Sequence, residues 1–224
     1  MRLTPYGARE IAVAVALCLP AIIIFLWLGA RTSFLWYAAA AMPAALLFLT
    51  LYFFRDPRRE AQLDKNSILS PADGTVTHID EVDEPCFIGG RALRISIFLS
   101  LFDVHLNRAP CAGQVVYKQA RAGEFVNAGR PDSTHRNTAQ DLGLETGDPR
   151  LPRILVRQIA GIIARRIVCH PDLGSRLSAG ECYGMIKFGS RTELYIPATC
   201  AVRVRMRVGE HVRAGVSVLA EIIS

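Results

Sequence analysis

Two long apolar runs open the chain. Residues 11–30 carry no charged side chain, residues 34–54 carry none either, and only three residues separate the two runs. Each run reaches the roughly 20 residues that a helix needs to cross the hydrocarbon core of a bilayer. Pro20 and Pro43 lie inside the runs, and membrane helices tolerate prolines when neighbouring groups satisfy the freed carbonyls. The pattern predicts an N-terminal transmembrane helical hairpin.

The arginines beside these runs indicate how the hairpin is oriented. Two arginines precede the first run and three follow the second, whereas Arg31 alone lies between them. Because the loops on the cytoplasmic side carry the excess of Lys and Arg, we expect the rest of the chain on the cytoplasmic face of the inner cell membrane. A cleaved signal peptide is the alternative for the first run, but a second apolar run follows it at once.

Beyond a polar connector the pattern changes to short strands. A turn at Asp73-Gly74 precedes alternating residues, residues 93–101 alternate apolar and polar side chains, and residues 202–208 do the same with arginines on one face. Residues 154–168 fit a strand followed by a helical turn, and residues 128–153 resemble a long surface loop.

These patterns predict a mainly β (α+β) fold in two parts. Residues 1–60 form the membrane hairpin, with helices at about 11–30 and 34–54, and its connector, and residues 61–224 form a barrel-sandwich-like β domain. The net charge of +6 is spread over both parts, which argues against a nucleic-acid partner. The six cysteines form no CxxC pair, so we expect free thiols and no zinc site.

Three polar residues are candidates for chemistry within this β domain. Asp73, His105 and Ser190 supply a carboxylate, an imidazole and a hydroxyl, the groups of a nucleophile, its base and an orienting acid. Each also fits a purely structural role, as a turn residue, a surface histidine and a bend. The Gly189-Ser190 dipeptide interrupts an otherwise continuous strand pattern over residues 185–197, and the pattern alone leaves the cause of that break open.

Several segments, in order, carry a family resemblance. The stretches "FFRDPRR", "PADGTV", "FDVHLNRAP", "GEF-NA", "RQIAGIIARRIV" and "GMIKFGSRTELYIP" closely resemble the short form of the phosphatidylserine decarboxylase family, over residues 54–224. The resemblance implies a proenzyme that cleaves itself at Gly189-Ser190 into a β chain, 1–189, and an α chain, 190–224. Ser190 would then become a covalent pyruvoyl group, and no metal would be needed.

The resemblance also implies an activity and residue roles. The pyruvoyl group would form a Schiff base with phosphatidylserine, a membrane phospholipid, and convert it to phosphatidylethanolamine and CO2. His105 is expected to transfer protons, and Asp73 matches the aspartate assigned to self-cleavage. Longer relatives carry a second histidine where this chain has Arg108, which cannot act as a base at neutral pH.

Some alternatives stay open at this stage. A decarboxylase of a related serine phospholipid, such as archaetidylserine, would need the same residues. The segment "HRNT" at residues 135–138 differs from the family's "NERN". This difference either changes the contacts with the substrate or lies in a surface loop whose sequence varies without functional effect. Residues 208–222 also resemble the hairpins of biotinyl and lipoyl carriers, so a non-enzymatic membrane-tethered module is the alternative class. The sequence leaves a homo-oligomer open.

Overall fold

The computed structural model describes residues 2–60, 64–129, 133–161, 166–187 and 189–223. The chain divides into two compact units, Met1–Arg58 and Arg59–Ser224. The helical turn predicted within residues 154–168 is wrong where the structure describes that stretch, because Ile159 ends a strand and Arg166 begins another; residues 162–165 fall outside the described residues.

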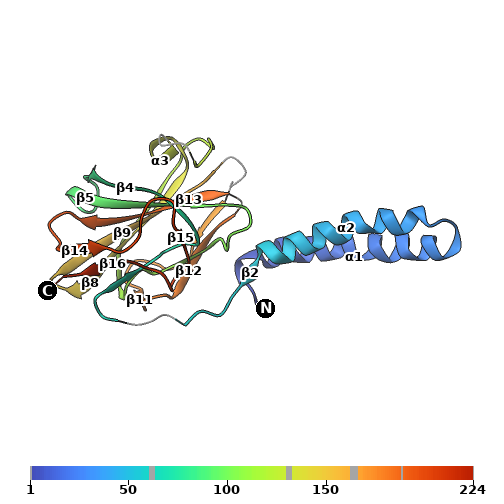
Figure 1. Ribbon diagram of the computed structural model, residues 1–224, viewed down its shortest axis with the longest axis horizontal. Helices are drawn as coiled ribbons and strands as arrows, with labels where there is room; N and C mark the ends of the chain where they lie inside the picture. The colour runs from blue at the N-terminus through green and yellow to red at the C-terminus, as the bar shows by residue number, and fades with distance from the viewer. Residues whose placement is uncertain (1, 61–63, 130–132, 162–165, 188, 224) are drawn as a thin grey trace. The chain divides into compact units, whose positions relative to one another are not determined.

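The first unit is a helical hairpin. Helices α1 (Ala8–Arg31) and α2 (Leu35–Phe53) lie side by side (Figure 1). A 3-10 turn, η1 (Pro5–Gly7), precedes α1, and the short strands β1 (Arg2–Leu3) and β2 (Arg55–Asp56) pair at the base. Both helices are long and apolar enough to cross a membrane, and only 6% and 11% of their most apolar windows are buried. The predicted pair of apolar helices is confirmed, and such surfaces favour lipid as the surrounding medium.

The second unit is built from strands and one short helix. Its elements are β3 (Ser67–Leu69), β4 (Gly74–Glu84), β5 (Gly90–Leu99), β6 (Leu106–Arg108), β7 (Gly113–Arg121), α3 (Ser133–Arg136), β8 (Ala139–Asp148), β9 (Leu151–Ile159), β10 (Arg166–Cys169), β11 (Arg176–Leu177), β12 (Cys182–Lys187), β13 (Ser190–Pro197), β14 (Val202–Val204), β15 (His211–Val212) and β16 (Val218–Ile222).

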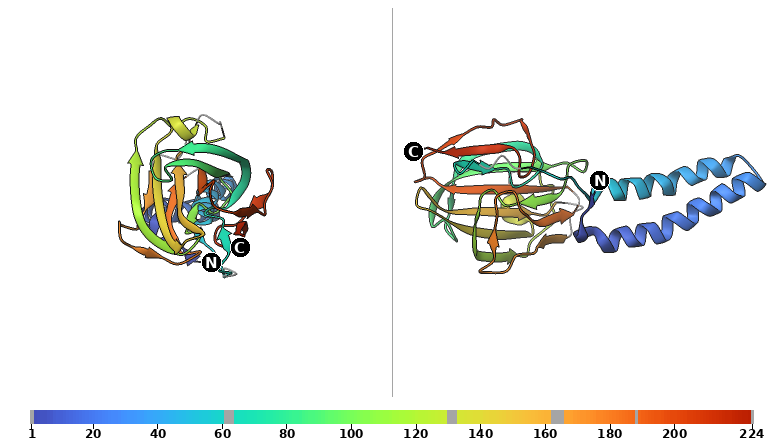
Figure 2. Two further views of the ribbon diagram at one scale, coloured as in Figure 1. Left: turned by 90° about the vertical axis from the view of Figure 1, so that its left-hand side faces the viewer. Right: turned by 90° about the horizontal axis from the view of Figure 1, so that it is seen from below.

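Most of these strands belong to one large antiparallel sheet. The order across it is β11-β7-β8-β9-β13-β5-β4-β15, and the sheet curls around the apolar core (Figure 2). Two three-stranded sheets, β10-β12-β6 and β14-β16-β3, complete the unit. The predicted mainly β class is therefore confirmed.

Strand β13 is the most enclosed strand of the large sheet. It pairs with β5 on one side and β9 on the other, and all eight of its residues are buried. Side chains alternate across a strand, so Leu194 and Ile196 enter the apolar core while Glu193 and Tyr195 enter a polar cluster on the opposite face. This placement fixes the backbone at Ser190, the first residue of β13.

The surface loop predicted for residues 128–153 is wrong. That stretch contains α3, all of β8 and the start of β9. Gly143, Asp141 and Glu145 have low strand propensity, but β8 gains its stability from two neighbouring strands. The ring of Phe87 packs where a side chain at Gly143 would lie, so the glycine that suggested a loop is a packing site.

Candidate active site

The break at Gly189 marks a change of sheet. Strand β12 ends at Lys187 in a three-stranded sheet, and β13 begins at Ser190 in the eight-stranded one. Gly189 has a φ of +56°, a left-handed conformation that glycine adopts without the steric cost paid by other residues. The interruption in the strand pattern is therefore a sharp redirection of the chain at the predicted cleavage bond.

Ser190 is completely buried, with an exposed fraction of 0%. In the part of the chain that the structure describes, its Oγ has no hydrogen-bond partner. Nearly all buried polar groups in proteins are hydrogen-bonded, and an exception calls for a functional explanation. A buried hydroxyl that is not held by any acceptor is free to turn toward the adjoining peptide bond.

His105 is also buried and lies against the same bond. Its Nε2 accepts a hydrogen bond from the backbone N–H of Gly189 at 3.1 Å, and its Nδ1 lies 3.0 Å from the carbonyl oxygen of Asp103. A carbonyl can only accept and an N–H can only donate, so Nδ1 carries the proton and Nε2 presents a lone pair. The base expected from the sequence is thus in its neutral, proton-accepting form beside Gly189.

Asp103 secures the loop that carries His105. Its carboxylate accepts hydrogen bonds from the N–H and hydroxyl of Ser100, both at 2.8 Å, and contacts His211 Nε2 at 3.0 Å. Burial alone raises the pKa of Asp103, but the hydrogen bonds from His211 and Ser100 outweigh it and hold the pKa below its ordinary value. The carboxylate therefore stays ionised and anchors the loop.

Gly161 lies against the carbonyl of Gly189. A Cβ at position 161 would come within 2.1 Å of the Gly189 oxygen, closer than any real contact. The buried Asn137 fixes this approach, because its Nδ2 donates to the carbonyls of Ala160 at 2.7 Å and Val126 at 2.8 Å. Asn137 belongs to the "HRNT" segment, so that segment is anchored beside the site.

Asp73 has other partners. Its carboxylate forms a two-pronged ion pair with Arg59, at 2.7 and 2.6 Å, and accepts the N–H of Ala214 at 2.8 Å. Among the described residues no hydrogen bond joins Asp73 to His105. The structure therefore brings Ser190 and His105 together at one bond and places Asp73 in a separate ion pair.

Arg108, at the position where the resemblance implies a histidine in longer relatives, donates to the carbonyl of Gly180 at 3.1 Å. His105 is thus the imidazole that the structure places at the Gly189-Ser190 bond.

A buried chain of side-chain hydrogen bonds was missed by sequence reasoning. Asn107 Nδ2 donates to Thr192 Oγ1 at 3.0 Å, and Gln158 Nε2 donates to Asn107 Oδ1 at 2.8 Å. Asn107 follows His105 by two residues, and Thr192 follows Ser190 by two. The bond between them therefore fixes the spacing of the two candidate reacting residues. Both lie inside the quoted motifs, but nothing in their spacing predicted the contact.

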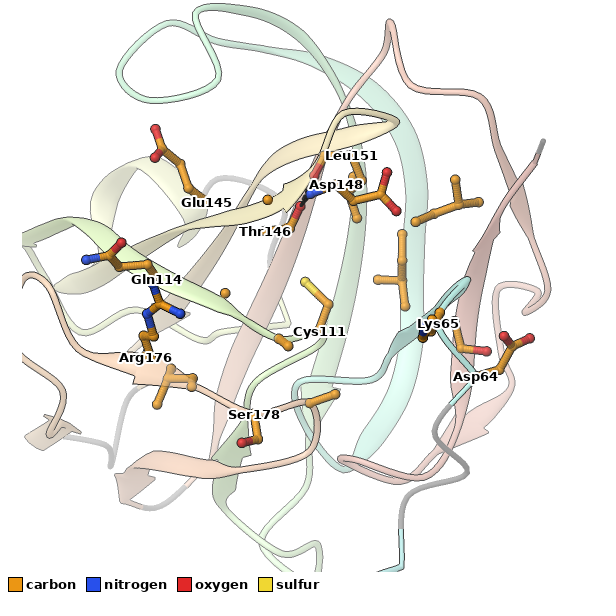
Figure 3. A pocket seen from close by; sticks show the side chains of 18 of the residues that line it. Asp64, Lys65, Cys111, Gln114, Glu145, Thr146, Asp148, Leu151, Arg176 and Ser178 are labelled. Atoms are coloured by element: carbon orange, nitrogen blue, oxygen red, sulfur yellow. Dashed lines mark hydrogen bonds between the residues drawn. The ribbon is translucent and has the colours of Figure 1, made fainter.

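The second unit also has a large open hollow away from this bond. It measures about 1030 Å³ and is lined by residues such as Lys65, Cys111, Glu145 and Arg176 (Figure 3). Neither Ser190 nor His105 nor Asp73 lines it. Over the residues that the structure describes, no group of His, Cys, Asp and Glu is arranged to hold a metal ion.

Comparison with known proteins gives a consistent result. The sequence model of a family described as phosphatidylserine decarboxylase matches residues 46–220. A phosphatidylserine decarboxylase proenzyme of Symbiobacterium thermophilum is 43% identical over 195 residues, which cover 87% of this chain and 89% of the relative. Proteins of the same name from Carboxydothermus hydrogenoformans and Aromatoleum aromaticum are 46% and 38% identical, over 79% and 97% of this chain and 82% and 96% of their own lengths.

Proposed function

The chain belongs to the phosphatidylserine decarboxylase family, and on that premise we propose that it is a self-cleaving proenzyme that converts phosphatidylserine to phosphatidylethanolamine and CO2. The observation that carries the proposal is the hydrogen bond from Gly189 N–H to His105 Nε2, beside the unpartnered hydroxyl of Ser190. It brings a base and a nucleophile to the bond that such a proenzyme must cut.

Self-cleavage begins with an exchange of an amide for an ester. The Ser190 Oγ attacks the carbonyl carbon of Gly189, and the C–N bond between the two residues breaks as the C–O bond forms. Once it releases the Gly189 N–H, His105 Nε2 takes the hydroxyl proton and returns a proton to the departing nitrogen of Ser190. The Asp103 carbonyl, hydrogen-bonded to Nδ1, stabilises the imidazolium that forms in between.

Elimination then separates the chains. Loss of the Cα proton of Ser190 expels the Gly189 carboxylate together with Oγ, which leaves an unsaturated residue at position 190. Water adds to that residue and ammonia leaves, so a pyruvoyl group remains at the start of residues 190–224. The buried, unpartnered position of the Ser190 side chain fits a small uncharged carbonyl group of this kind.

The pyruvoyl group supplies a carbonyl that condenses with the amine of the substrate and withdraws electrons while CO2 leaves. The residues around it do the remaining work. His105, held by Asp103, can give a proton to the carbon that loses CO2. The hydrogen bond between Asn107 and Thr192 keeps His105 at a fixed spacing from position 190. We assign Asp73 a positioning role through Arg59.

The site of action follows from the substrate. Phosphatidylserine stays in the bilayer, and two apolar helices associate the protein with a membrane. We propose that the catalytic unit works on the cytoplasmic face of the inner membrane, because arginines flank the outer ends of the helical hairpin.

Intact-mass spectrometry of the purified protein tests the proposal. We expect two chains, the smaller starting at position 190 with a blocked N-terminus, and release of CO2 from phosphatidylserine. Ser190→Ala is expected to give a single uncleaved chain, and His105→Gln to slow cleavage by at least about 100-fold.

Matched controls separate chemistry from folding. His78→Gln removes a histidine of β4 whose ring, among the residues that the structure describes, is hydrogen-bonded only to Thr77. This variant should cleave normally. Wild-type protein that decarboxylates phosphatidylserine as one intact chain would contradict the mechanism, and an intact, inactive chain would favour the non-enzymatic module.

A further inference from the structure

Two apolar side chains near the proposed cleavage bond are strongly exposed to solvent, and they are neighbours in sequence. Leu101 is 45% exposed and Phe102 is 70% exposed. Phe125, at 40%, is the other exposed phenylalanine among the described residues of the catalytic unit. Large apolar side chains exposed together mark a surface that meets a partner. We call Leu101, Phe102 and Phe125 the apolar rim.

Leu101 lies close to Gly189. It follows β5, whose last residue, Leu99, pairs with Ser190. A Cβ at Gly189 would lie 3.8 Å from the Leu101 side chain. The exposed pair Leu101-Phe102 therefore lies at the end of the sheet where β5 finishes and β13 begins.

The segment that carries Phe125 is connected to the same end of the sheet by hydrogen bonds of its neighbours. The N–H of its neighbour Val126 donates to Asn137, at 3.0 Å, and Asn137 donates to the carbonyl of Ala160. Gly161, the next residue, packs against the Gly189 carbonyl. The segment of Phe125 is thus linked through Asn137 and Ala160 to the residue that packs against the Gly189 carbonyl.

The loop of Leu101 and Phe102 is held in place rather than loose. Asp103 binds both the N–H and the hydroxyl of Ser100 and also contacts His211. The exposed side chains therefore project from a fixed loop, and burying them against a partner costs little further ordering of the backbone.

The start of the second unit is fastened to the same part of the domain. Arg59, six residues after the last residue of α2, forms its ion pair with Asp73. Asp73 immediately precedes β4, whose residue Thr75 pairs with Phe98 of β5, three residues before Leu101. The ion pair thus holds the first residue of the second unit against the strands that lead to the apolar rim.

We propose that the apolar rim enters the interfacial region of a phospholipid bilayer, so that a lipid head group reaches position 190 without the acyl chains leaving the membrane. The inference rests on the proposed function, because only a lipid substrate calls for a bilayer at this edge. Apolar side chains gain free energy when they enter the boundary between head groups and acyl chains.

Tryptophan fluorescence in the full chain tests the rim. Trp27 and Trp36, the chain's two tryptophans, are replaced by Phe, and Phe102→Trp is reconstituted in phosphatidylcholine–phosphatidylglycerol vesicles with brominated acyl chains. We expect blue-shifted emission and at least twofold quenching relative to unbrominated vesicles. Leu173→Trp, at a position that is 63% exposed in a turn beside β11, is the matched control and should show neither effect.

Two outcomes would overturn the proposal. Equal emission and quenching for Phe102→Trp and Leu173→Trp would show that the rim stays in water. A blue shift without quenching, growing with the ratio of protein to lipid, would put a second copy of the chain on the rim. The vesicles contain no phosphatidylserine, and the measurement is repeated with Ser190→Ala, so its result does not depend on cleavage or decarboxylation.

Activity supplies an independent readout. Phe102→Ser should lower the ratio of turnover on bilayer phosphatidylserine to turnover on a dispersed short-chain phosphatidylserine by about tenfold, and Leu173→Ser should leave that ratio unchanged. An unchanged ratio for Phe102→Ser would count against the rim. Absent turnover on both substrates in the wild-type protein would instead count against the proposed function.

Discussion

At the scale of single residues, the reactive bond is held from both sides. His105 accepts the Gly189 N–H, and Gly161 leaves room for the Gly189 carbonyl. Both contacts orient the peptide unit that we propose Ser190 attacks. Orientation of this kind contributes strongly to rate, and a displacement of about 1 Å can cost about 100-fold.

Gly161→Ala tests this orientation. Its Cβ would collide with the Gly189 carbonyl oxygen at 2.1 Å, so the carbonyl must shift from its present position. We expect self-cleavage to slow by about 10- to 100-fold. The rate is measured from the appearance of the two chains on denaturing gels over time. Gly90→Ala is the matched control, since a Cβ there meets nothing within 4 Å. Equal cleavage rates for the two variants would show that Gly161 does not position the carbonyl.

The sequence named the candidate reactive residues, but it did not predict all of their partners. Ser190 and His105 were named from motifs, and the structure brings them to one bond. Asp73 was expected beside them, but a carboxylate's partner depends on which chain segment folds against it, and Arg59 is that partner. The contacts of Gly161, Asn107 and Thr192 arise between strands distant in sequence, which no local pattern reports.

At the scale of elements, strand β8 depends on a buried ion pair. Arg157 of β9 binds Asp141 of β8 through two hydrogen bonds of 2.7 Å and also donates to the hydroxyl of Tyr195. Burial by itself lowers the pKa of Arg157, but the hydrogen bonds and charges of Asp141, with those of Tyr195 and Glu193, raise it above its ordinary value. Arg157 is therefore charged in the folded protein at all ordinary pH values.

Asp141→Asn should weaken the sheet. It leaves the buried Arg157 charge without its main counter-ion, and breaking such a pair costs about 3 kcal/mol in the free energy of unfolding. Urea unfolding of the Ser190→Ala protein in detergent would report the loss as a lower midpoint. Asp148→Asn, at the end of the same strand in a partly exposed pair with Arg150, should leave the midpoint unchanged. Similar midpoints for both variants would show that β8 does not depend on the buried pair.

The element patterns were predicted well where alternation was strong. The apolar helices and the strands at β4 and β5 follow their local periodicity, whereas the alternation at residues 202–208 gives only the short strand β14. Strand β8 was missed because its glycines and acidic residues resemble a loop, while its stability comes from Phe87 and Arg157 elsewhere in the chain.

At the scale of the whole molecule, the two chains expected after cleavage stay interleaved. Residues 190–224 would contribute β13, β14, β15 and β16, and β13 lies between β5 and β9 of the other chain. Strands β15 and β16 also pair with β4 and β3. Cleavage therefore removes one covalent bond and leaves the sheet pairing unchanged.

We expect the two chains to co-purify in mild detergent and to separate only in denaturant. Size-exclusion chromatography followed by denaturing electrophoresis of each fraction would show this, with the uncleaved Ser190→Ala protein as the reference elution volume. Elution of the short chain by itself without denaturant would contradict the interleaved arrangement.

The central position of β13 also sets the order of events in maturation. While the chain is continuous, its strands find one another as parts of one molecule. Once it is cut, a separated short chain must meet its partner by diffusion, and reassembly becomes a second-order process that slows on dilution. A molecule that unfolds after cutting also carries a chain end already converted from serine and cannot repeat the reaction. Folding must therefore precede cleavage, and each molecule matures only once.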